Sequence, residues 1–269
     1  PSNRSVWESL ARYGVETRAA DIANGTVPEA AIIECTDHNT RLVSVSSVQY
    51  GTGLRLDLDV LGAACRERDI LFCVDAIQSL GAIEFDAQAC LADFVMADGQ
   101  KWMMGPEGVA LFYCRHEVME RLELRQYGWR MVANRDDYGS HSWEVAGSAR
   151  RFECGSPNMT GIHALHASLA FIHATGMQTI QQRVLENSRF MIDYLLRHPD
   201  RYRLLTPVEE DRHAGIVTFV PLQESAEALH AMLTGQGVVC ALRAGGVRFS
   251  PHFHTPRKQL FSALELLGS

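Results

Sequence analysis

The chain has 269 residues, of which 46% are hydrophobic and 21% charged, and its formal net charge is −7. This length and hydrophobic fraction are typical of a globular chain with one large domain and a smaller one. The negative net charge excludes the basic surface that nucleic-acid binding requires. No apolar run approaches the length of a membrane span and no apolar leader precedes Pro1, so we expect a cytoplasmic protein without a membrane partner.

The first part of the chain alternates between helical and extended patterns. We predict a helix at 5–13, a turn into a strand at 14–18, a helix at 28–35, a strand at 41–48 and a helix at 57–69. Pro28 suits a first helical position, and β-branched residues favour the strand. Gln49 follows that strand, where it can face a ligand site or equally bond its own backbone as a loop amide.

Two apolar runs dominate the middle of the chain. The first, at 70–74, fits a strand buried on both faces and is followed by Asp75; the second, at 92–97, leads to a glycine-containing loop with Lys101. Strand, helix and strand alternate through Cys114, which is typical of a parallel sheet with crossover helices. Asp75 is then at the carboxyl end of a strand, where open α/β sheets bind ligands.

The last part of the chain predicts a second, smaller unit. A polar loop at 134–148 precedes a helix from about 161 and a longer helix at 177–198. Beyond it we predict strands at 215–220, 238–242 and 247–249 with helices at 225–234 and 257–267. The expected domains are therefore 1–177, a large α/β domain, and 178–269, a small α+β domain.

Lysine is scarce, which draws attention to Lys101. The 25 basic residues include only one other lysine, Lys258, so 23 of them are arginine. A lysine in such a chain can be retained because only a primary amine becomes a neutral nucleophile for an aldehyde. The alternative is an ordinary surface lysine, whose methylene groups lie along apolar surface and whose ammonium group is in water. The position of Lys101 in the sequence is equally compatible with this alternative.

Cysteine and histidine patterns give no metal site. The seven cysteines are scattered without a CxxC pair, several of them in apolar runs, which predicts reduced, buried thiols. His163 and His166 have helical spacing but belong to no metal-binding pattern, so we expect them on a helix surface and expect no bound metal.

Four segments of the chain have a specific pattern: VDAIQSLGAIEFD, ADFVMADGQKWMMGPEGVALFY, RRFECGSPNMTGIHALHASLAFI and ALRAGGVRFSPHFHTPRKQLFSAL. They resemble the class V aminotransferase family of fold type I enzymes, which use pyridoxal 5′-phosphate (PLP), and the first two are the most specific. The last of the four resembles its kynureninase and cysteine desulfurase-like branches. The resemblance implies a mostly parallel sheet with helices on both faces, plus the small α+β C-terminal domain.

The resemblance also assigns the cofactor-binding residues. Lys101 would hold PLP as a Schiff base and act as the catalytic base, and Asp75 would pair with the pyridine nitrogen. Gln78 would lie near the ring oxygen, unless it is an exposed amide at a helix start. Gln100 would contact the phosphate, and Gln49 is kept as a further cofactor contact. Asp98 is left out, because an anion close to a phosphate is unfavourable.

Other matching residues imply a substrate clamp and a partner subunit. Gly155 and Ser156 match a segment that reaches the phosphate of the neighbouring subunit, which implies a homodimer with shared active sites. Arg248 matches the arginine that grips the substrate carboxylate, with Arg243 as the second candidate.

The family's N-terminal arm, first strand and phosphate-binding loop have no counterpart in this sequence. We therefore expect the N-terminal part of the large domain to be missing from this chain, either from the gene or from this form of it.

The expected function is PLP-dependent chemistry on an amino acid, either transamination or a lyase reaction at Cα or Cβ. Kynureninase-like C–C hydrolysis and a cysteine desulfurase or selenocysteine lyase-like reaction are alternatives. No cysteine follows Cys240, which disfavours the usual desulfurase mechanism. A truncated or degenerate member without catalysis is the alternative of another class.

Overall fold

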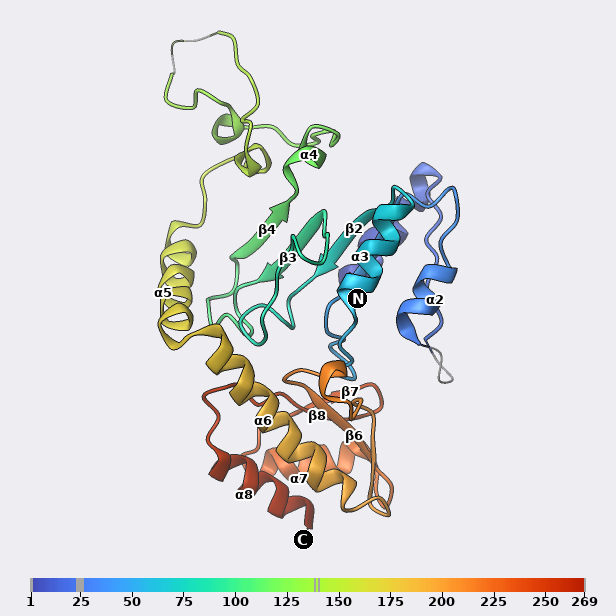
Figure 1. The fold of residues 1–269 in the computed structure, drawn as a ribbon. Helices are drawn as coiled ribbons and strands as arrows, with labels where there is room; N and C mark the ends of the chain where they lie inside the picture. Colours follow the sequence, from blue (N-terminus) through green and yellow to red (C-terminus); the bar gives the residue numbers. More distant parts are fainter. Residues whose placement is uncertain (1, 23–26, 138, 140, 269) are drawn as a thin grey trace.

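The structure, a computed structural model, describes residues 2–22, 27–137, 139 and 141–268. Its strands form two separate four-stranded sheets, and the long helix α6 runs from the first unit along the second (Figure 1). Within the described ranges, no helix is long and apolar enough to cross a membrane.

The helices fall into three groups along the chain. The α-helices are α1 (Ser2–Glu8), α2 (Pro28–Glu34), α3 (Leu58–Glu67), α4 (His116–Met119), α5 (Met159–Thr175), α6 (Met177–Leu196), α7 (Ala226–Gly235) and α8 (Arg257–Gly268). Short 3-10 helices are η1 (Ser9–Tyr13), η2 (Trp129–Met131), η3 (Ala149–Phe152) and η4 (Glu210–Arg212). Helices α1 to α4 belong to the first sheet, α5 follows it, and α6 to α8 pack with the second sheet (Figure 1).

The N-terminal sheet is mostly parallel. Its strands, in spatial order, are β1 (Leu42–Ser46), β2 (Leu71–Asp75), β3 (Phe94–Asp98) and β4 (Ala110–Cys114). The first three are parallel and β4 is antiparallel to β3. Ser46 lies opposite Asp75, which lies opposite Met96. The carboxyl ends of the three parallel strands therefore meet at one edge, and Asp75 is at that edge, as predicted.

Strand β2 is buried on both faces, as its unbroken apolar run predicts. Phe72 and Val74 pack in the same cluster as Leu61 of α3. Cys73 points to the opposite face and packs in the cluster of Val118 from α4. Helices thus cover both faces of the sheet.

The second sheet and its helices form a separate layer, here named the C-terminal layer (residues 177–268). Its strands, in spatial order, are β5 (Tyr202–Leu204), β6 (Val217–Pro221), β8 (Gly246–Phe249) and β7 (Ala241–Arg243), and every pair is antiparallel. Helices α6, α7 and α8 contribute Met191, Leu229 and Leu264 to one core cluster with Phe219 and Val247 of the sheet. This is an α+β layer of the kind that the sequence predicts.

Helix α6 packs with both units. Ile180 and Val184 in its first half belong to the cluster of Trp102, beside Lys101, whereas Met191 and Leu195 in its second half belong to the core of the C-terminal layer. One continuous helix therefore carries packing contacts from the lysine loop to the second sheet.

Two local predictions are wrong, and one short strand was not predicted. Residues 14–18 form no strand, because no strand lies beside them and Val15 is exposed to water. The segment between β2 and β3 forms successive turns instead of a helix: Gly81 has φ +89°, and the Ser79 hydroxyl bonds the Ala76 carbonyl at 3.1 Å. Strand β5 was not predicted, because three residues give too short a pattern.

Candidate active site

Lys101 lies in a tight loop directly after β3. The Gly105 amide donates to the Gly99 carbonyl at 2.7 Å, and the Met104 amide donates to the Lys101 carbonyl at 3.0 Å. Met104 adopts φ +56°, a left-handed conformation that costs free energy for a residue with a side chain. Leu165 of α5 packs against both glycines, so that a Cβ at Gly105 would lie 2.7 Å from its Cδ1. The loop is therefore held in one conformation at the sheet edge.

Asp75 is a half-buried acid that forms no ion pair with any residue in the described ranges. Burial raises the pKa of its carboxyl, while the Ile77 amide, which donates to Oδ1 at 3.1 Å, and the charge of Lys101 act in the opposite direction. The net pKa is raised. Because a desolvated carboxylate is stabilised by a nearby cation, this position suits a cationic ligand group.

Lys101 is exposed as a residue, yet the surroundings of its amine lower the amine's pKa. Desolvation is the largest cause, Arg248 and Arg243 act in the same direction, and Asp75 and Asp98 oppose it. These four charged groups are close enough to shift the Lys101 titration, although they come from four different strands, β2, β3, β7 and β8. The structure thus brings Asp75, Arg243 and Arg248 to Lys101, and it adds Asp98, which the sequence argument left out.

Arg248 extends from β8 with an incomplete set of partners. Its Nη1 donates to the Tyr50 carbonyl at 2.7 Å, while Nε is buried and has no hydrogen-bond partner. Burial lowers the pKa of this guanidinium, and so does Arg243. Among the ion pairs of the described residues, none involves Arg248, Arg243 or Lys101. The guanidinium is therefore available to an anion.

The loop after β1 is fastened to the C-terminal layer by three consecutive carbonyl oxygens, those of residues 50–52. Arg248 holds the first, Thr218 Oγ1 donates to the second at 2.7 Å, and Thr206 Oγ1 donates to the third at 2.6 Å. Gln49, directly before this loop, is half-buried, and its backbone closes the loop through bonds with Gly53 and Leu54. The second layer therefore fixes the backbone next to Gln49.

The remaining predicted residues have different environments. Gln78 is 5% exposed, and its side-chain oxygen accepts the Trp102 indole N–H at 3.0 Å, so it is not an exposed helix-start amide. Gln100 is exposed beside Lys101. Gly155 and Ser156 are exposed in the segment before α5, and in the described part of the chain no hydrogen bond links either to the lysine loop.

Two residues near Lys101 were missed by the sequence argument. Trp102 is 4% exposed and packs under the loop, and His252 Nε2 lies 3.1 Å from its carbonyl oxygen. The position of Trp102, directly after the lysine, was a signal in the sequence. His252 gave none, because it is 150 residues away.

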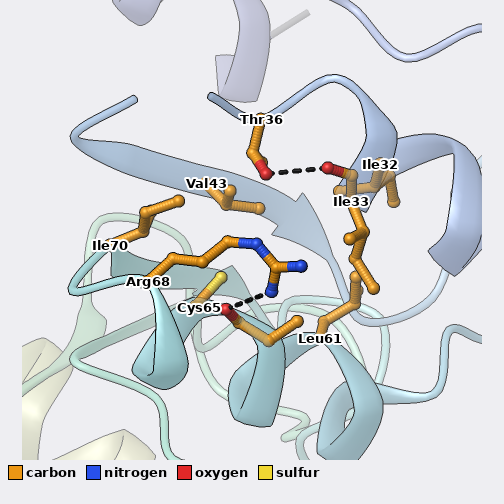
Figure 2. A pocket seen from close by; sticks show the side chains of 9 residues that line it. Ile32, Ile33, Thr36, Val43, Leu61, Cys65, Arg68 and Ile70 are labelled. Carbon is orange, nitrogen blue, oxygen red and sulfur yellow. Dashed lines mark hydrogen bonds between the residues drawn. The ribbon is translucent and has the colours of Figure 1, made fainter. Parts of the chain in front are cut away.

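An apolar hollow between α2, β1 and α3 does not provide a second site. Ile33, Val43, Leu61 and Cys65 are among the residues that line it (Figure 2), and its volume is about 10 Å³. A space of this size holds one water at most. Burial raises the pKa of the Cys65 thiol to about 11, so this thiol is not a reactive nucleophile at neutral pH.

The cysteines form no disulfide with one another. All seven cysteines are free, and burial raises the thiol pKa of Cys65, Cys73, Cys90, Cys114 and Cys240. Over the described residues, no group of three or more His, Cys, Asp or Glu side chains is arranged to hold a metal ion.

Comparisons with known proteins agree on one family. The family model "Aminotransferase class-V" matches residues 1–256. A "Probable cysteine desulfurase" of Methanothermobacter thermautotrophicus is 31% identical over 182 residues, which are 67% of this chain and 45% of that protein. A cysteine desulfurase of Cronobacter sakazakii is 27% identical over 91% of this chain and 58% of its own length. The chain thus spans about half the length of these relatives.

A solved structure has the same fold. The apo structure of a cysteine desulfurase from Thermococcus onnurineus matches with a TM-score of 0.88 and 22% sequence identity, over 99% of this chain and 69% of that one. The fold class expected from the sequence, an α/β fold of type I with a mostly parallel sheet, is confirmed.

Proposed function

The chain belongs to the class V aminotransferase family, and on that premise we propose that it is a PLP-dependent enzyme acting on an amino acid. The observation that carries the proposal is the meeting of Lys101, Asp75 and Arg248 at the edge of the N-terminal sheet. An amine, an acid and an unpaired guanidinium from three separate elements lie within electrostatic reach of one another.

The residues present fit PLP. The amine whose pKa is lowered suits the cofactor's aldehyde, because the neutral form is the nucleophile. Asp75, a half-buried carboxyl whose pKa is raised by burial, suits the protonated pyridine nitrogen. For the phosphate we propose Gln100, together with Gly155 and Ser156 of a partner subunit, and we propose Gln49 and Gln78 as further contacts or supports.

The chain's own residues then have separate tasks. When bound, PLP draws electrons from the α-carbon of an amino acid attached to it, so that a bond at this carbon can break. Lys101 Nζ moves the proton at the α-carbon, a task for which a lowered pKa is an advantage near neutral pH. Asp75 keeps a negative charge at the ring nitrogen.

Arg248 binds the substrate carboxylate in this proposal. Its Nη1 is anchored on the Tyr50 carbonyl, and in the described part of the chain the guanidinium forms no ion pair, which leaves donors for a carboxylate. The anchor restricts the guanidinium before substrate arrives, so less conformational entropy is lost on binding. Arg243, exposed at the end of β7, adds positive charge.

The proposed reaction is transamination or a lyase reaction at Cα or Cβ. A desulfurase that passes sulfur to its own cysteine needs an activated thiol, whereas burial raises the pKa of five of the seven thiols, Cys240 included. This favours release of the product from the site without a covalent step on a chain cysteine.

We further propose a cytoplasmic homodimer with shared active sites. Tyr127, Trp129 and Trp143 are about half exposed or more, and they lie in the segment that projects from the first unit between α4 and α5 (Figure 1). Aromatic side chains of this kind are enriched at interfaces. Seven free thiols fit a reducing compartment. The sedimentation coefficient of the purified protein tests the dimer.

Lys101→Arg and Lys258→Arg form the matched pair of variants that tests the cofactor assignment. Each keeps a positive charge, and the chain has no other lysine. With added PLP, the wild type and Lys258→Arg are expected to develop a visible absorbance band and, after borohydride reduction, to carry a pyridoxyl group on Lys101 by peptide mapping. Lys101→Arg is expected to do neither. Modification of Lys258 instead of Lys101, or no modification of the wild type, contradicts the proposal and supports the non-catalytic alternative.

A further inference from the structure

The peptide that joins Trp102 to Met103, one residue beyond Lys101, is clamped between two parts of the fold. On one side is the Gly81 backbone, where a Cβ would lie 2.6 Å from the Trp102 carbonyl carbon and 2.8 Å from the Met103 amide nitrogen. On the other side is His252, whose Nε2 lies 3.1 Å from the Trp102 oxygen. The peptide is therefore packed against the Gly81 backbone and hydrogen-bonded to the His252 ring.

The hydrogen bond from His252 has a defined direction. Its Nδ1 accepts the Phe253 amide N–H at 3.0 Å, so the ring proton is on Nε2 and is donated to the Trp102 carbonyl. Burial lowers the pKa of His252 to about 4, and the neighbouring His254 acts in the same direction. The ring is therefore neutral at pH 7. It also lies against the Trp102 indole, with centroids 5.0 Å apart.

His252 is itself held firmly. The Thr255 hydroxyl accepts the His252 amide at 3.0 Å, and the Thr255 amide donates to the His252 carbonyl at the same distance. Asn187, buried on α6, donates its side-chain amide to that carbonyl at 3.1 Å. The ring therefore cannot follow the lysine loop if that loop moves.

The same short segment carries the proposed carboxylate ligand. Arg248 on β8 is four residues before His252. The Arg248 side chain binds the carbonyl of Tyr50 in the loop after β1, and the His252 side chain binds the carbonyl of Trp102 in the lysine loop. The relative position of Arg248 and Lys101 depends on both contacts.

We propose that His252 is a positioning residue for Lys101: its N–H fixes the Trp102 carbonyl and so places the lysine amine among its charged neighbours. The inference deepens the proposed function and rests on it only for the use of Lys101 as the reactive amine. The charges that face this amine are Asp75 on β2, Asp98 on β3, Arg243 on β7 and Arg248 on β8. Without the clamp, the loop would let the amine move into water, and its pKa would rise toward that of an ordinary lysine.

The test is a titration of the two lysines in the cofactor-free protein. Reductive methylation with ¹³C-formaldehyde labels Lys101 and Lys258, and their NMR signals report each pKa separately. His252→Phe keeps a ring against the indole but removes the donor, whereas His252→Gln keeps an N–H near the place of Nε2. His198→Phe is the control, because His198 Nδ1 also lies on a backbone carbonyl, that of Tyr194 at 2.8 Å, at the far end of α6.

We expect the Lys101 titration to move to higher pH in His252→Phe and to keep its wild-type position in His252→Gln and His198→Phe. The Lys258 titration is expected to stay in place throughout. An unchanged Lys101 titration in folded His252→Phe overturns the proposal. An equal shift in His252→Phe and His252→Gln also overturns it, because a variant that keeps the N–H would then behave like one that lacks it. The titration needs no PLP, so failure of the cofactor assignment leaves its outcome unaffected.

Discussion

Gly215 offers the sharpest test of the packing under the lysine loop. It lies just before β6, is buried, and faces the Trp102 indole so closely that a Cβ would be 2.7 Å from Cζ3 and 2.8 Å from Cζ2. Its φ is outside the left-handed region, so the Gly215→Ala substitution brings no backbone strain and acts through the added methyl alone.

The indole has little freedom to move aside. Gln78 holds its N–H, and the His252 ring covers it. Forcing a methyl into a well-packed core costs about 1–3 kcal/mol, and the fixed indole places Gly215→Ala at about 3 kcal/mol. In a chain of this size, that destabilisation lowers the Tm by roughly 6–12 °C.

Urea and thermal unfolding followed by far-UV circular dichroism measure this change. The matched control is Gly235→Ala at the end of α7, where an added Cβ meets nothing within 4 Å. There alanine is the better helix former, so we expect stabilisation of up to about 1 kcal/mol. A Gly215→Ala protein within about 0.5 kcal/mol of the wild type, the range of an uninvolved surface site, would refute the packing argument.

Two further predictions concern charged groups. Glu29 accepts from both Nη atoms of Arg212, at 2.9 and 3.1 Å, and from the Asp57 amide at 2.7 Å. Burial alone would raise the pKa of Glu29, but these hydrogen bonds outweigh it and the net pKa is lowered. Glu29→Gln should therefore cost about 2–4 kcal/mol at pH 7. This difference in unfolding free energy between the wild type and Glu29→Gln is fully present above the unfolded-state pKa of about 4.3, and it is lost as the pH falls through the lower folded pKa. Urea unfolding of both proteins at pH 7 and at pH 3–4 measures the difference. An equal difference at the two pH values would contradict the prediction. The second prediction concerns the pKa of Lys101 in the ¹³C-methyl titration and has opposite signs for two variants. Asp75→Asn should lower this pKa further, because the substitution removes an attractive negative charge. Arg248→Gln should raise this pKa, because the substitution removes a repulsive positive charge. Shifts of the same sign would show that the two groups do not act on Lys101 as charges.

The sequence determined the elements that are set by local pattern. The apolar run before Asp75 forms β2 within one residue of its predicted bounds, because a strand buried on both faces is encoded by a few consecutive apolar residues. Pro28 begins α2, as predicted, because the fixed φ of proline suits a first helical position. The proximity of Asp75 and Lys101 was also predictable, because Asp75 ends β2, Lys101 follows β3, and these two strands lie side by side in a parallel sheet.

The tertiary structure alone decided how the site is completed. Arg248 reaches Lys101, and His252 reaches Trp102, across about 150 residues of chain, and no periodicity in either segment encodes the other. The segment after Asp75 forms turns and not the expected helix. The turn at Gly81 allows the Trp102 peptide to pack against the Gly81 backbone, which is a long-range contact. Local sequence fixes strands because their burial is a property of the segment itself, whereas the environment of an amine depends on which distant groups the folded chain places around it.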